Sequence, residues 1–184
     1  MTRFGRLAIG LAGLAMITAC RAHPVVKTGA DPGTAAPAGG GKSSAKPVAH
    51  VGDTINLAGN GDGEKVAVKI VKVADPARGS DFYSPDKGNR FVAVQFKLTN
   101  VGTAAYDDSP SNGAVVVDAD GQRFDATIAD VTAGPSMDSG LKMAAGDSAL
   151  GYIVFEVPKA SKLRSVQFTL DSGFAEETGQ WQLP

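Results

Sequence analysis

Short runs of alternating apolar and polar residues constrain the fold of this chain more than any other feature. The clearest run places Val92, Val94, Phe96 and Leu98 on one face and small or polar residues on the other. A period of two residues is typical of a β-strand with one buried face. Similar runs recur across residues 51–183 without a long amphipathic helix between them. The pattern therefore predicts an all-β domain.

The other predicted strands are separated by Gly, Asp, Asn and Pro, which are the residues that tight turns select. Their apolar positions are Val51, Ile55 and Leu57, then Val66, Val68 and Ile70, then 114–117, then Ile153, Phe155 and Val157, then Val166, Phe168 and Leu170, and last 181–183. The apolar parity changes at Val71, where Val71 and Val73 continue the apolar set, and this predicts a β-bulge or a strand that passes between sheets. Seven or eight such strands predict an antiparallel β-sandwich, with a ligand-holding barrel as the alternative.

Three longer loops connect the predicted strands and form the candidate contact surface, because sandwiches usually carry function on loops. They cover residues 75–90, 103–113 and 127–145. We expect Phe82 and Tyr83, in the first loop, to fold back onto the domain. Any helix in the third loop is limited to one or two turns.

The first twenty residues have the composition of an export signal. Arg3 and Arg6 precede a run from Leu7 to Ile17 that is apolar or Gly and too short to cross a bilayer stably. The following Ile-Thr-Ala-Cys resembles the bacterial lipobox, with Ile17 in place of the usual Leu. The resemblance implies a lipoprotein signal peptide over residues 1–19 and a diacylglycerol, with or without an added N-acyl chain, on Cys20. An ordinary secretory signal is the alternative.

Residues 20–48 have the composition of a flexible linker. They contain four prolines and a Gly-Gly-Gly run, with few large apolar side chains to offset the entropy of ordering. We expect a disordered, lipid-anchored tether with an average span of about 30 Å. The folded domain is then expected to occupy residues 49–184.

Charge and cysteine content exclude several classes of function. Without residues 1–19 the chain has 16 basic and 19 acidic residues, a net charge of −3. This balance, with no basic run, argues against nucleic acid as a partner. Cys20 is the only cysteine, so once it is lipidated no free thiol remains, which excludes a disulfide, a thiolate nucleophile and a cysteine-containing metal site.

Four aspartates are the only candidates for a metal site. Asp107 and Asp108 precede one predicted strand, and Asp118 and Asp120 flank the turn after it. Several converging carboxylates would suit calcium. However, Asp and Gly are also the residues that a tight turn selects, and the remaining ligands of a calcium loop are missing. We therefore favour turn formation and expect no metal or other cofactor besides the lipid on Cys20.

The sequence offers no set of catalytic residues. His50, at the edge of the domain, is the only histidine near it, and no Gly-x-Ser-x-Gly motif is present. The Gly-rich stretch 59–63 lies between two predicted strands rather than before a helix, so it is not a phosphate-binding loop. We expect a protein that is not an enzyme.

Five short motifs, in this order, resemble the uncharacterised immunoglobulin-like domain of Gram-positive lipoproteins, a family related to the secreted immunoprotective antigen of mycobacteria. They are Val-Gly-Asp-Thr at 51–54, Phe-Val-Ala-Val at 91–94 leading to Leu-Thr-Asn-Val-Gly at 98–102, Asp-Ala-Asp-Gly at 118–121, Ala-Gly-Asp at 145–147 and Val-Phe-Glu-Val-Pro at 154–158. The resemblance implies an immunoglobulin-like sandwich, export from the cell and no established enzymatic activity. The family supplies no catalytic residues.

These observations favour a membrane-anchored lipoprotein at the outer face of the cytoplasmic membrane. It would act as a binding module for another envelope protein, a wall polymer or a host protein. The alternative is a carrier that holds a small or lipidic ligand between its sheets, in a cavity of a few hundred Å³ beside a mobile loop around Met137–Met143. Calcium-dependent adhesion and hydrolysis have weaker support.

Overall fold

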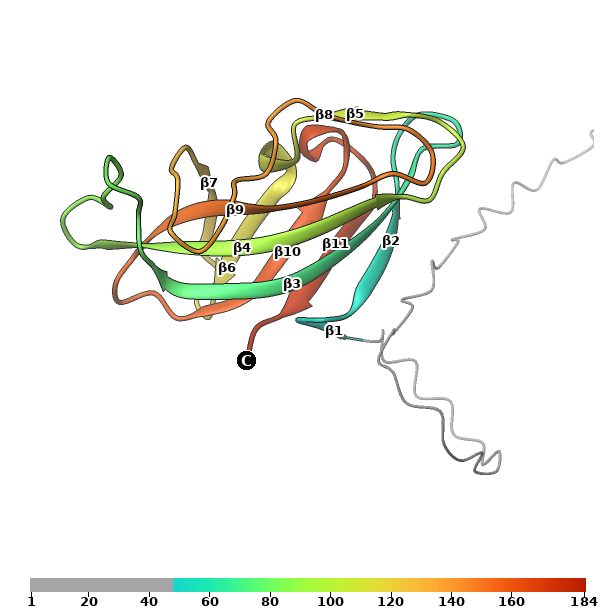
Figure 1. The fold of residues 1–184 in the computed structure, drawn as a ribbon. Helices are drawn as coiled ribbons and strands as arrows, with labels where there is room; N and C mark the ends of the chain where they lie inside the picture. Colours follow the sequence, from blue (N-terminus) through green and yellow to red (C-terminus); the bar gives the residue numbers. More distant parts are fainter. Residues whose placement is uncertain (1–47) are drawn as a thin grey trace, which may run out of the picture.

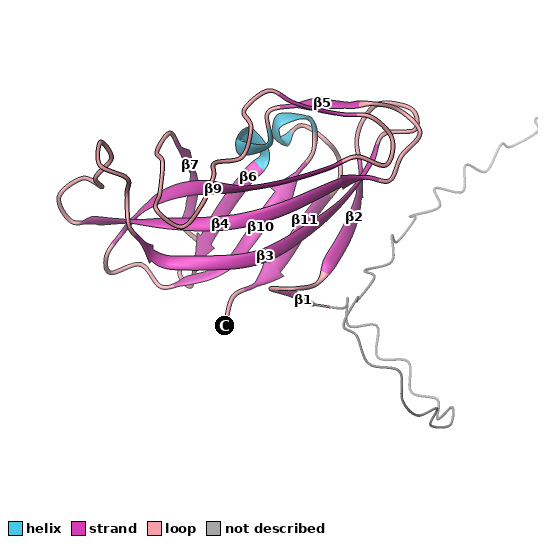
Figure 2. Ribbon diagram, in the orientation of Figure 1, coloured by secondary structure: helices cyan, strands magenta, loops and turns pink. Residues whose placement is uncertain are grey.

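In the computed structural model, residues 48–184 are described, and β-strands dominate them (Figure 2). The first sheet has the order β2–β3–β4–β9, with bounds Thr54–Ala58, Lys65–Ala77, Asn89–Asn100 and Ser148–Pro158. The second has the order β1–β11–β10–β6–β7, with bounds Ala49–His50, Thr178–Gln182, Leu163–Thr169, Ala114–Asp118 and Arg123–Thr127. The predicted antiparallel sandwich is confirmed.

The short elements lie at the margins of the two sheets. β5 (Tyr106–Asp108) and β8 (Leu141–Met143) form a separate two-stranded sheet, and the 3₁₀ helices are η1 (Pro110–Gly113) and η2 (Asp171–Gly173). Eight strands have five residues or more, in agreement with the predicted seven or eight. The sequence did not reveal β1, β5 and β8, because two or three residues are too few to show alternation.

Strand β7 joins the two sheets along one side of the sandwich (Figure 1). It pairs with β6 through Asp125 and Val115, and with β9 through Ala126 and Phe155. All strand pairs are antiparallel except β1 with β11. Strands β6 and β7 form a hairpin, and its turn is the one that Asp118 and Asp120 were expected to flank.

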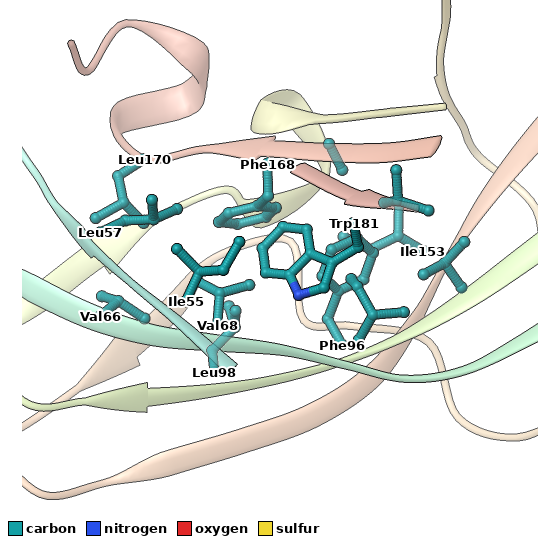
Figure 3. Close-up of a cluster of buried hydrophobic side chains, with 14 of the residues drawn as sticks. Ile55, Leu57, Val66, Val68, Phe96, Leu98, Ile153, Phe168, Leu170 and Trp181 are labelled. Atoms are coloured by element: carbon teal, nitrogen blue, oxygen red, sulfur yellow. The ribbon is translucent and has the colours of Figure 1, made fainter. Parts of the chain in front are cut away.

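The core lies between the two sheets, where the alternating apolar residues meet (Figure 3). The rings of Phe96 and Phe168 are 5.3 Å apart at their centroids, one from each sheet. Trp181 is fully buried beside them. These large side chains fill the interior, so the space between the sheets is occupied by protein. The apolar strand faces predicted from periodicity form this core.

The parity change in β3 is a β-bulge. Ile70 pairs with Phe96 and Lys72 pairs with Gln95, which leaves Val71 without a partner. The extra residue returns Val73 to the core, where it is half-buried. The predicted bulge is confirmed, but the assignment of Val71 to the buried set was wrong, because its side chain is 38% exposed.

The expectation for Phe82 and Tyr83 is correct for only one of them. Tyr83 packs against buried apolar residues, whereas the side chain of Phe82 is 96% exposed. Phe82 is a central residue of a tight turn that the Tyr83 N–H closes by donating to the Ser80 carbonyl oxygen at 2.9 Å, so its side chain points into solvent while Tyr83 returns to the domain. The predicted signal peptide, the lipidated Cys20 and nearly all of the predicted tether lie outside the described residues.

Candidate binding surface

Two of the predicted loops cover part of the outer face of the first sheet. There, Phe91 and Ala93 of β4 and Tyr152 and Val154 of β9 point away from the sandwich core, yet all four are buried. They form a second apolar cluster with Ala129 and Val131 of one loop and Tyr83 of the other. The loops are therefore packed as part of the fold.

Backbone hydrogen bonds hold these two loops together. The Ser80 N–H donates to the Asp130 carbonyl oxygen at 2.8 Å, and the Thr132 N–H donates to the Arg78 carbonyl oxygen at 2.9 Å. Gly79 lies between them, and a Cβ there would overlap the carbonyl oxygen of Tyr83. The second loop is also fixed to β9, because the Met137 N–H donates to the Tyr152 carbonyl oxygen at 2.8 Å.

A half-open cavity of about 210 Å³ lies beside β9, where the loops meet. It is lined by Tyr83, Ser111, Thr127, Ile128, Ala129, Asp130, Ser136, Met137, Ser139, Tyr152, Ile153 and Val154. All three predicted loops contribute to this lining. Tyr83 comes from 75–90, Ser111 from 103–113 and Ala129 from 127–145. The structure thus brings together segments that are separated in the chain.

Two large apolar side chains are exposed on the same loops. Ile128, which lines the cavity, is 93% exposed, and Phe82, next to Tyr83, is 96% exposed. We call the cavity lining together with Phe82 the loop surface. Isolated exposed apolar residues are common, but Ile128 lines the hollow and Phe82 lies on a loop that lines it through Tyr83, and exposed apolar residues on such loops are typical of a contact surface.

The polar groups of the loop surface include one pair of side chains in hydrogen-bond contact. The Asp130 carboxylate accepts a hydrogen bond from the Ser136 hydroxyl at 2.7 Å, and no histidine lines the cavity. Within residues 48–184, no group of three or more His, Cys, Asp or Glu side chains is placed to hold a metal ion. The arrangement can bind through shape and apolar contact.

The first pair of candidate metal ligands is engaged in structural contacts. Asp107 forms an exposed ion pair with Lys142 across β5 and β8, at 2.8 Å. The Asp108 carboxylate accepts hydrogen bonds from the Ser172 N–H at 2.9 Å and the Ser172 hydroxyl at 2.6 Å. Asp108 therefore fixes η2 against the end of β5.

The second pair of candidates belongs to the β6–β7 turn. Asp118 is buried, and its Oδ1 accepts hydrogen bonds from the N–H groups of Asp120 and Gln122, at 3.1 and 2.9 Å. Gly121 adopts a φ of +85°, which the turn requires. Strand β6 separates this turn from Asp107 and Asp108, so the four aspartates do not form one site.

The sequence did not reveal a second acidic cluster. Glu64, Asp108 and Asp171 lie close together where the β2–β3 loop meets η2. Partial burial and then the negative charge of Asp171 raise the pKa of Glu64 above its usual range. Burial, followed by the charge of Asp108, raises the pKa of Tyr106 as well. Nothing in the local sequence places Glu64 and Asp171 together.

This acidic end is held by hydrogen bonds to backbone groups. The Asn60 N–H donates to the Asp171 carboxylate at 2.7 Å, and the Ala58 N–H donates to the Glu177 carboxylate at 2.9 Å. A hollow of about 360 Å³ nearby is lined by Ala58, Gly59, Asn60, Glu176 and Glu177. This polar lining does not suit a lipidic ligand.

No helix within the described part of the chain is long and apolar enough to cross a membrane.

Comparison with known proteins gives one family and several similar folds. The model of a domain of unknown function, DUF4352, matches residues 50–178. No curated protein matches the chain.

Among solved structures, the secreted protein MPT63 of Mycobacterium tuberculosis is 14% identical, with a TM-score of 0.53 and coverage of 76% of this chain and 99% of that one. YjhA of Bacillus subtilis is 13% identical, with a TM-score of 0.52 and coverage of 74% and 100%. YcdA, a putative lipoprotein of B. subtilis, is 17% identical, with a TM-score of 0.50 and coverage of 65% and 38%. At these identities the likeness establishes the shared fold, and the resemblance expected from the sequence is confirmed.

Proposed function

Since the chain belongs to the DUF4352 family, whose function is unknown, we propose that it is a lipid-anchored, non-enzymatic binding module of the cell envelope. The loop surface carries this proposal, because three loops line one cavity and two of these loops each expose a large apolar side chain, Phe82 and Ile128. The lipobox-like sequence before Cys20 supports anchoring. The secreted and putative-lipoprotein descriptions of two proteins with this fold are consistent with export.

The features of the loop surface favour a protein partner. The cavity of about 210 Å³ is smaller than the roughly 300–1,000 Å³ of ordinary small-molecule pockets. It is better suited to one apolar side chain of a partner. Phe82 and Ile128 would in turn be buried by that partner, as are the aromatic and aliphatic residues that dominate the binding energy of protein interfaces.

The carrier alternative has less support. Its ligand would lie between the sheets, where Trp181, Phe96 and Phe168 are fully buried and fill the interior. The cavity near Met137 lies beside β9 at the loop surface. Binding of a lipid between the sheets would require these side chains to separate.

Crosslinking of the lipidated protein in intact cells, followed by mass spectrometry, tests the proposal. We expect a reproducible envelope protein whose crosslinks map to residues 75–90, 103–113 or 127–145. A partner crosslinked only through residues outside these loops would contradict the assignment of the loop surface. Co-purification of a stoichiometric lipid without any protein would instead favour the carrier.

A further inference from the structure

The half of the first sheet's outer face that the loops leave uncovered carries four lysines. Lys65, Lys69 and Lys72 project outward from β3, with the bulge between Lys69 and Lys72 keeping all three on this face, and Lys97 projects from β4. Lys65, Lys72 and Lys97 are exposed and Lys69 is half-buried. We call these four residues the lysine face.

Within residues 48–184, no carboxylate forms an ion pair with the lysine face. The side chains of its four lysines make no ion pair or hydrogen bond with another described residue. The acidic side chains nearest along the chain bond elsewhere, since Glu64 accepts the Gly61 N–H and Asp75 forms an ion pair with Arg90. The outward neighbours of the lysines on the adjacent strands include Thr99, Ser148 and Leu150.

This placement of charges does not favour the stability of the fold. Lys69 and Lys97 are directly opposite on antiparallel strands, and like charges in such pairs destabilise a sheet. Lysine often protects edge strands from aggregation, but β3 and β4 are interior strands, with β2 and β9 on either side. Neither stability nor edge protection therefore accounts for the lysine face.

The outer face of the second sheet shows a different arrangement. There, Arg123 donates to the Gln167 side chain at 2.6 Å, and Gln167 donates to the Gln180 side chain at 2.8 Å. The polar side chains of that face satisfy one another. On the lysine face, by contrast, the four ammonium groups have no such partner among the described residues.

The overall charge of the domain makes the lysine face distinctive. Residues 48–184 contain 12 basic and 18 acidic residues, a net charge of −6, yet four of the 12 basic residues lie on this face. The preceding residues 20–47 add Arg21, Lys27, Lys42 and Lys46 against Asp31 alone. An acidic domain thus has a positive face and a positive segment leading to its N-terminal side.

We propose that the lysine face docks on the anionic phospholipid headgroups of a bilayer. Lysine stems can lie along the interface while their ammonium groups contact phosphates. Leu150, which is 57% exposed and pairs with Lys97, adds an aliphatic contact that a lipid surface accommodates and a soluble polyanion does not. The face is a sheet surface rather than a groove, which fits a planar partner.

Vesicle sedimentation of the unlipidated protein tests the proposal independently of the anchor and of the loop surface. The chain from residue 20 onward with Cys20→Ser contains every residue of both apolar clusters. We expect it to partition onto vesicles of phosphatidylcholine mixed with phosphatidylglycerol, and much less onto phosphatidylcholine alone. High salt should abolish the binding, because the attraction is electrostatic. Equal partition onto both vesicle types would overturn the proposal.

Matched charge variants locate the docking face. Lys69→Gln with Lys97→Gln should weaken partition onto anionic vesicles by about 10- to 30-fold, from the typical contribution of each lysine near such a surface. Lys159→Gln with Lys162→Gln removes the same charge from the β9–β10 turn and should have a much smaller effect. Equal losses in the two double variants would show that binding depends on net charge alone, and this would overturn the assignment of the face.

Substitution of Leu150 distinguishes binding to a bilayer from binding to a soluble polyanion. Leu150→Gln should reduce vesicle binding while leaving the net charge unchanged. Soluble poly(glycerol phosphate), at the same phosphate concentration as the vesicles, should compete poorly. If Leu150→Gln binds vesicles like the parent chain and the polymer displaces the protein completely, the face recognises an anionic wall polymer and the bilayer proposal fails.

Discussion

The indole N–H of Trp181 donates a hydrogen bond to the main-chain carbonyl oxygen of Asp53 at 3.0 Å. Trp181 belongs to β11 of the second sheet, and Asp53 immediately precedes β2 of the first. The Ala58 N–H, at the other end of β2, donates to Glu177. These contacts tie β2 to the second sheet on the side of the sandwich away from β7, so β2 is not an open edge for strand addition.

Removal of this contact should destabilise the domain. Trp181→Phe loses the indole donor, leaves the Asp53 carbonyl oxygen without its partner and creates a small void. We expect a loss of about 1–3 kcal/mol in the free energy of unfolding. Chemical denaturation followed by circular dichroism measures it, since Trp181 is the only tryptophan and its fluorescence is lost in the variant. A loss no larger than that of the exposed Phe174→Ala would contradict this role.

Substitutions of Asp118 distinguish a role in turn formation from a role in calcium binding. Asp118→Ala removes the acceptor of two backbone N–H groups and should destabilise the domain by about 1–3 kcal/mol. Asp118→Asn keeps an acceptor oxygen and should lose less than half as much. Millimolar calcium should not change the Tm of the parent chain in differential scanning fluorimetry. A rise of several degrees that Asp118→Asn abolishes would restore the calcium interpretation.

The acidic end should make stability depend on pH. The folded-state pKa of Glu64 lies above its usual 4.5, so the folded protein binds more protons than the unfolded chain between the two values. Stability should therefore fall as pH rises through that interval. Glu64→Gln should stabilise the domain at pH 7 by up to about 1 kcal/mol, the range for partly exposed charges. The gain should disappear below pH 4.

The comparison of Glu64→Gln with Glu176→Gln gives the control. Glu176 is exposed at the same end of the molecule but is not one of the charged groups that raise the pKa of Glu64. Denaturation curves at pH 4, 5 and 7 measure both variants. Equal stabilisation by the two substitutions would mean that net charge, rather than the contact between Glu64 and Asp171, causes the effect.

The lipobox prediction is tested by Cys20→Ala. Without the thiol that accepts the diacylglycerol, we expect the protein to leave the membrane fraction or to accumulate as an unprocessed precursor. Cell fractionation and the mass of the precursor distinguish these forms. Retention in the membrane as a processed chain, after a high-salt wash that removes contacts of the lysine face, would contradict lipid anchoring.

The sequence predicted the strands of the sandwich where one face is buried and the other is not. Val92, Val94, Phe96 and Leu98 alternate with small or polar residues. A period of two residues is sufficient to identify a strand of this kind. It also located the bulge at Val71 to within one residue. It did not show that Ala93 is buried on the opposite face, because that depends on loops packed from elsewhere.

The candidate site was predictable only in outline. The three loops were identified from composition, but their convergence follows from the β5–β8 pair and from the hydrogen bonds between residues 78–80 and 130–132. Tyr152 and Val154 are apolar on the outward side of β9, and this was a usable sign that something covers that face. Contacts such as Glu64 with Asp171 join residues far apart in sequence and left no local signal.

The most direct test of the account is site-specific photocrosslinking in intact cells, with a photoreactive phenylalanine analogue at position 82 or at position 174. Both side chains are highly exposed, at 96% and 84%, but only Phe82 belongs to the loop surface. We expect a partner protein to be captured from position 82 and much less from position 174. Equal capture from both positions, or capture from position 174 alone, would contradict the loop surface as the binding site.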